Sequence, residues 1–225
     1  MIFPIGDDNI FGGHKAIASY TLLFLNIIIF LYTITLGSNA DLFLNKYGCI
    51  PFEIVHNQDL FTLITSMFLH GGWMHIIGNM LFLWIFADNI EAVIGSVMFL
   101  IFYLIGGLFA TGVHIIMDLN STVPIVGASG AISAVMGTYL VMFPKSRIKI
   151  IFLLFFSTFY LPAIAFLGLW FIQQLFSGIG NIGPQTVEQG GGVAWWAHIG
   201  GFIYGLVIGL ILKQRYGKNY SYGNV

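Results

Sequence analysis

Long apolar stretches, separated by short polar segments, dominate the hydrophobic pattern of this chain. A helix that crosses a bilayer needs about 20 predominantly apolar residues, and each stretch approaches or exceeds this length. The six predicted spans lie near residues 16–35, 69–87, 93–116, 125–143, 148–177 and 193–212. The pattern therefore predicts an all-α membrane protein with six transmembrane helices and both chain ends on one side.

Composition narrows the class of protein. Hydrophobic residues make up 58% of the chain and charged residues 8%, whereas a soluble domain carries about 25% charged residues. This excludes a water-soluble globule and makes the lipid bilayer a partner. The eight Lys and Arg residues are scattered, so we expect no nucleic-acid binding.

The basic residues predict the orientation, because Lys and Arg are retained on the cytoplasmic side. With both termini inside, seven of the eight are cytoplasmic and only Lys46 lies outside. The seven are Lys15, Lys145, Arg147, Lys149, Lys213, Arg215 and Lys218. We expect a cytoplasmic N-terminal segment at 1–15, a six-helix domain at 16–212 with an outer loop at 36–68, and a cytoplasmic tail at 213–225. No cleavable leader is evident.

Polar side chains inside the spans suggest chemistry at one depth. If the fourth helix begins just after Pro124, Ser129 lies about five residues in, or ~8 Å at 1.5 Å per residue. The second and sixth helices, beginning near residues 70 and 193, place His75 and His198 at a similar depth. Three reactive side chains thus share one level near the outer surface.

Helix periodicity predicts which faces meet. Small residues at a spacing of four let helices approach closely in lipid. The fourth helix presents Ser129, Ser133 and Gly137 on one face, and the sixth presents His198, Gly201, Gly205 and Gly209. His75 and Asn79 are four residues apart, so both point the same way. A nucleophile, a base and two donors are what acyl transfer requires.

Each of these residues also has a structural interpretation. A serine in a membrane helix often bonds the carbonyl one turn back. A histidine such as His198 can serve packing or a proton relay, and Asn79 can bridge two helices.

Taken together, the motifs are specific, and the chain resembles the rhomboid family of intramembrane serine proteases. The resemblance extends over nearly the whole chain. It rests on Tyr47-Gly48, Pro51, the run Leu63–Gly72, His75, Asn79-Met80, Glu91, Gly95, Gly127–Gly130, Ala197-His198, Gly201 and Gly205.

The resemblance implies a serine endopeptidase that cuts transmembrane protein substrates in or beside their membrane segments, without cofactor or metal. Ser129 would be the nucleophile and His198 the base of a dyad, with His75 and Asn79 stabilising the oxyanion. Supporting roles fall to His70 and to four glycines, Gly127, Gly130, Gly201 and Gly205. The bare six-helix form resembles bacterial members, which implies a bacterial cytoplasmic membrane.

The chain departs from the family pattern at two places. Many relatives carry a Trp-Arg pair in the outer loop where this chain has Phe61-Thr62. Some place a Tyr one turn after the nucleophile to stack on the histidine, whereas this chain has Ser133. An aromatic residue or Met136 is then expected to support His198.

Other functions fit less well. No HExxH motif occurs, which disfavours metalloproteolysis, and no Asp lies in the core of a predicted span. A catalytically silent relative that binds membrane proteins is the main alternative. A small transporter is less favoured because no internal repeat is seen. We also expect the long fifth span, with Pro162, to be tilted or kinked and to admit substrate.

Overall fold

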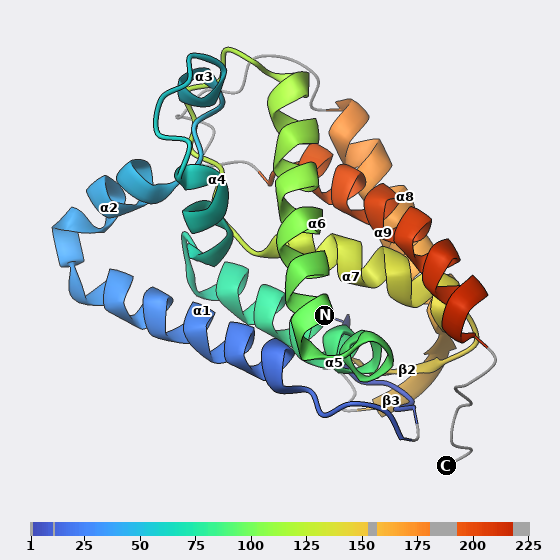
Figure 1. Cartoon of the computed structure of the whole chain (residues 1–225). Coiled ribbons are helices and arrows are strands. Elements are labelled where there is room, and N and C mark those ends of the chain that lie inside the picture. Colours follow the sequence, from blue (N-terminus) through green and yellow to red (C-terminus); the bar gives the residue numbers. More distant parts are fainter. Residues whose placement is uncertain (1, 11, 153–156, 181–192, 218–225) are drawn as a thin grey trace.

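The computed structural model describes residues 2–10, 12–152, 157–180 and 193–217. Helices long and apolar enough to cross a membrane within these ranges are α1 (Ile17–Thr35), α5 (Trp73–Ile94), α6 (Ser96–Met117), α8 (Ala163–Gly180) and α9 (Trp195–Tyr216). The shorter apolar α7 (Ser129–Met142) lies among them (Figure 1). The predicted helical multi-pass membrane bundle is confirmed.

Burial separates a protein core from a lipid-facing surface. Almost every residue of α7 is buried, whereas the longer helices each expose large apolar side chains. Examples are Phe24, Val97, Ile101, Phe176 and Leu210. A broad exposed apolar surface is typical of contact with a membrane, so α7 is the helix that the others enclose.

Contacts fix the helix directions. The Phe30 and Trp73 rings lie 5.0 Å apart, while at the opposite ends of α1 and α5 the Ser19 amide donates to Glu91 at 2.7 Å. These two helices are therefore antiparallel. The Glu91 carboxylate also accepts the Ala18 amide at 2.7 Å, which satisfies amides that the first turn of α1 leaves without helical partners.

The outer loop holds α2 (Ala40–Tyr47), α3 (Pro51–Val55) and α4 (Thr62–Thr65), with 3-10 turns at Gly37–Asn39 and Ser66–Phe68. Buried Cys49 forms an antiparallel bridge with Ile125, just before α7. The two backbone hydrogen bonds of this bridge measure 3.0 and 2.8 Å. Burial raises the pKa of the Cys49 thiol to about 12. The outer loop thus anchors the segment that leads into α7.

A small sheet closes the opposite end of the bundle. Strands β1 (Ile2–Gly6), β2 (Arg147–Phe152) and β3 (Ser157–Pro162) are antiparallel in the order β1-β2-β3. Arg147 and Lys149 alternate with buried Ile148 and Ile150, as expected of a strand with one covered face. The N-terminal segment is therefore docked against the chain between α7 and α8.

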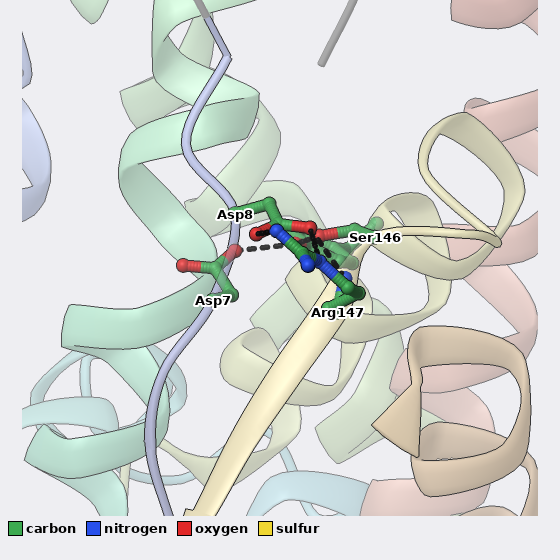
Figure 2. Close-up of polar contacts among 5 residues, drawn as sticks. Asp7, Asp8, Ser146 and Arg147 are labelled. Atoms are coloured by element: carbon green, nitrogen blue, oxygen red, sulfur yellow. Dashed lines mark hydrogen bonds and ion pairs between the residues drawn. The ribbon is translucent and has the colours of Figure 1, made fainter. Parts of the chain in front are cut away.

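Polar contacts reinforce this docking (Figure 2). The Tyr139 hydroxyl, at the far end of α7, lies 2.7 Å from the Ser146 hydroxyl and donates to the Asp7 carboxylate. Asp8 forms an ion pair with Arg147, with 3.0 Å between Oδ2 and Nε. Burial raises the pKa of Asp7 to about 7. Partial burial opposes any lowering of the pKa of Asp8, but the bonds and charge of Arg147 outweigh it and lower that pKa.

Three predicted boundaries are wrong. Residues 147–162 form strands on either side of undescribed residues 153–156, so the fifth helix begins at Ala163, and Pro162 ends β3 rather than kinking a helix. The fourth helix begins at Ser129, not after Pro124, and the second begins at Trp73. A short apolar run does not by itself distinguish a buried strand or extended segment from a helix.

Candidate active site

The site is built on the packing of α7 against α9. A Cβ on Gly201 would collide with the Gly130 carbonyl, and one on Gly205 with the Ala134 carbonyl. Residue numbers rise together along the contact, so the two helices run parallel. The predicted small-residue faces do meet, because backbones this close leave no room for a side chain.

This packing carries Ser129 and His198 to the same end of the bundle. At Gly130, an added Cβ would lie 3.8 Å from the Cβ of Ala197. Ser129 immediately precedes Gly130, and His198 immediately follows Ala197. The predicted pair therefore flanks a single contact between the first turns of α7 and α9.

Ser129 occupies the first position of α7 rather than a site five residues inside it. Ala128, which precedes it, makes no side-chain capping bond, and the first helical bond of α7 runs from the Ile132 amide to the Ala128 carbonyl at 3.0 Å. The amides of the first turn of a helix lack helical partners. Ser133 donates to the Ser129 carbonyl at 2.7 Å, so the bond one turn back belongs to Ser133.

Gly127 brings the start of α7 against α5. Its amide donates to the Ser66 carbonyl at 2.9 Å, and its φ is +127°. A Cβ at Gly127 would lie 2.7 Å from His75 Nε2 and 3.6 Å from Asn79 Nδ2. Only glycine accommodates both this backbone conformation and this approach. His75 and Asn79 therefore lie beside the loop that precedes Ser129, as their shared helix face predicts.

Asn79 carries an unused donor. Its side chain is buried, and Nδ2 has no hydrogen-bond partner among the described residues. A buried amide without a partner costs free energy. Such a donor beside the start of α7 is available to a ligand.

Sequence reasoning missed the residue that contacts His198. Gln174 of α8 is 3% exposed, and its Oε1 lies 2.8 Å from His198 Nδ1. The rings of Trp170 and Trp195 have centroids 5.9 and 6.1 Å from the imidazole. An aromatic neighbour was expected, but a hydrogen-bonding amide was not. The available signal was a glutamine within an apolar span, where polar side chains are costly.

Two further features are the packing of His70 and the anchoring of the outer loop. His70 is buried, and its ring centroid lies 5.1 Å from that of His75, so it packs behind the candidate donor. In place of the outer-loop Trp-Arg pair, Thr62 donates to the Asp59 carbonyl and Thr65 to the Tyr47 carbonyl, each at 2.7 Å. Threonine hydroxyls thus anchor the outer loop.

The sequence matches the Rhomboid domain over residues 57–215. This match covers most of the chain, including α5 to α8, all but the last residue of α9, and every candidate site residue above. The chain belongs to the rhomboid family.

Similar rhomboid proteins come from distant organisms. "RHOMBOID-like protein 5" of Arabidopsis thaliana is 27% identical over 80% of this chain and 52% of its own length. "Rhomboid protein 1, mitochondrial" of Saccharomyces cerevisiae is 28% identical over 92% and 57%. "Rhomboid protease GluP" of Bacillus subtilis is 29% identical over 93% and 38%. The chain spans about half the length of the first two relatives.

Proposed function

We propose that this rhomboid protein is a serine endopeptidase that hydrolyses peptide bonds within or next to transmembrane segments of other membrane proteins. The observation that supports this most directly is the Gly130–Ala197 contact. Ser129 precedes Gly130 and His198 follows Ala197, so the contact brings the first turns that carry the serine and the histidine together, at a start of α7 without a side-chain cap. The catalytic domain assigned here is 16–212, with 36–68 as its outer loop.

In the proposed reaction, Ser129 Oγ attacks the substrate carbonyl carbon while His198 takes the hydroxyl proton. A serine hydroxyl needs an adjacent base to become a competent nucleophile. His198 then gives this proton to the leaving amine, whose departure leaves an acyl-enzyme. Water then gives a proton to His198 and attacks the ester carbonyl, and His198 returns this proton to Ser129 Oγ as the ester bond breaks and the second product leaves as a carboxylic acid.

Negative charge develops on the carbonyl oxygen in both steps. The candidate donors are the Ser129 amide, His75 and the unpartnered Asn79 amide. Donors fixed in advance in a dry site stabilise this charge, and loss of one costs about 10²–10³ in kcat.

The substrate helix must unwind locally, because all backbone groups of an intact transmembrane helix are hydrogen-bonded within the helix. We place its entry along α8, since α8 has the smallest buried share of the five long helices.

The localisation that we propose is a bacterial cytoplasmic membrane with both termini inside. The basic residues support the orientation: among the described residues, the end of the bundle that carries the sheet holds Lys15, Lys145, Arg147, Lys149, Lys213 and Arg215. Lys218 lies outside the described residues.

Purified protein in liposomes, mixed with a model transmembrane substrate, tests the proposal. We expect wild type to cut and Ser129→Ala and His198→Ala to lose cutting while remaining folded. Ser38→Ala and His56→Ala, at an exposed serine and an exposed histidine of the outer loop, are controls that should keep activity. Cutting that survives Ser129→Ala would refute the mechanism. No cutting of any of several substrates by wild type would favour a membrane-protein binder.

A further inference from the structure

We propose that Gln174 of α8 is the positioning residue for His198. Its amide oxygen accepts a hydrogen bond from the protonated Nδ1, which leaves Nε2 as the unprotonated nitrogen that can take the proton of Ser129. The inference rests on the proposed function for its consequence in catalysis. The hydrogen bond itself is a property of the fold.

The contacts of the Gln174 amide determine its orientation. Nε2 of Gln174 donates to the Trp170 carbonyl at 3.2 Å. A carbonyl only accepts, so the amide nitrogen must face it. The opposite end of the same amide, Oε1, therefore faces His198 Nδ1 at 2.8 Å. An amide oxygen also only accepts, so Nδ1 must carry the proton.

Packing holds this pair in place. Gln174 is 3% exposed and His198 9%. One turn away the rings of Phe171 and Phe202 stack, with centroids 4.4 Å apart and planes 14° apart. At the opposite side, a Cβ on Gly178 would lie 3.0 Å from Ile199. The α8–α9 contact is thus close on both sides of the Gln174–His198 bond.

The consequence for a serine and histidine dyad is specific. Only a neutral imidazole with its free lone pair toward the hydroxyl can act as base, and the partner of the other ring nitrogen selects that tautomer. In triad enzymes an acidic residue does this and also stabilises the imidazolium. Here a neutral amide supplies the orientation without placing a second charge in a buried site, where charges are costly.

The sharpest test compares Gln174→Ala with Gln173→Ala in the full-length protein in liposomes. Gln173 is the neighbouring residue of α8 and is exposed. Gln173→Ala therefore removes the same side chain from the same helix as Gln174→Ala, but from the exposed face. We expect Gln174→Ala to lower kcat about tenfold, the worth of one hydrogen bond near 1.4 kcal/mol, with KM unchanged. Gln173→Ala should keep the wild-type kcat.

Gln174→Glu keeps a hydrogen-bond acceptor on a side chain of the same length. It keeps the proposal testable if Gln174→Ala fails to fold. It should retain most of the wild-type kcat. The acidic limb of its pH profile should move to higher pH, because a carboxylate favours the imidazolium. A pH profile identical to wild type would overturn the proposal, and so would a wild-type kcat in Gln174→Ala.

A readout independent of catalysis separates this inference from the proposed function. With ¹⁵N-labelled histidine, and the His198 signals assigned by their loss in His198→Ala, we expect a protonated Nδ1 and a bare Nε2 in wild type. In Gln174→Ala the two tautomers should mix. A wild-type His198 protonated on Nε2 would overturn the positioning role even if Ser129 proves essential. Retention of the expected tautomer would support the bond even if no substrate is cut.

Discussion

Gly205 of α9 lies against the main-chain carbonyl of Ala134 in α7, with no room for a methyl group between them. The same relationship recurs one turn earlier, between Gly201 and Gly130. These contacts set the distance between the two helices that carry Ser129 and His198, so the site depends on the absence of side chains.

Gly205→Ala is therefore expected to push α9 away from α7. Inserting a methyl group into a tightly packed core costs about 1–3 kcal/mol, and 1 kcal/mol lowers Tm by about 2–4 °C in a chain of this size. We expect Tm to fall by about 5 °C in detergent and cleavage to fall with it. Gly112→Ala is the matched control, since a Cβ at Gly112 in α6 meets nothing within 4 Å. Equal Tm losses in both variants would mean that the α7–α9 contact is not tight.

The variant Asn79→Leu is expected to lower activity without lowering stability. Replacing the buried, unpartnered amide of Asn79 by leucine removes an unsatisfied donor, so Tm should stay the same or rise. Loss of an oxyanion donor should lower kcat by about 10²–10³. Asn26→Leu is the comparison and should keep the wild-type kcat, because Asn26 is a buried asparagine of α1, a helix that carries none of the candidate site residues. Full activity in Asn79→Leu would remove Asn79 from the proposed oxyanion site.

The docked N-terminal segment predicts a pH-dependent stability. The pKa of Asp7 rises from its ordinary value of 3.8 to about 7, mainly through burial. Between these values the folded chain holds a proton that the unfolded chain has lost, so the free energy of unfolding falls as pH rises. One such proton contributes a slope of up to about 1.4 kcal/mol per pH unit, equivalent to several degrees in Tm from pH 5 to 7.

Thermal unfolding of Asp7→Asn across this pH range checks the effect. Its Tm should depend less on pH than that of wild type, because asparagine does not titrate. Asp8→Asn serves as control: the lowered pKa of Asp8 places its titration below this range, so the wild-type slope should remain. An unchanged slope in Asp7→Asn would assign the pH dependence to another group.

Helical periodicity predicted which helix faces meet near Ser129 and His198 and that His75 and Asn79 share a face, because a residue in a spanning helix repeats its direction every three to four positions. The predicted depth of Ser129 was wrong, because the residues just before it are not helical. The role of Gln174 could not be predicted, since it depends on how far α8 is rotated and shifted along α9. The strand at Arg147–Phe152 was missed although its charged and apolar residues alternate. Its apolar residues continue into a long hydrophobic run, and that run also fits a helix.

The sequence by itself determined the membrane class, the family, the small-residue faces of the two central helices and the residues that face one another there. Those features follow from hydrophobicity, periodicity and motif, which are local properties of the chain. Tertiary structure alone decided that Ser129 begins α7 instead of lying within it, that the N-terminal strand β1 joins β2 and β3 in one sheet, and that the amide of Gln174 in α8 bonds to His198. Each depends on contacts between segments far apart in the chain, where packing selects one among several conformations that the local sequence permits.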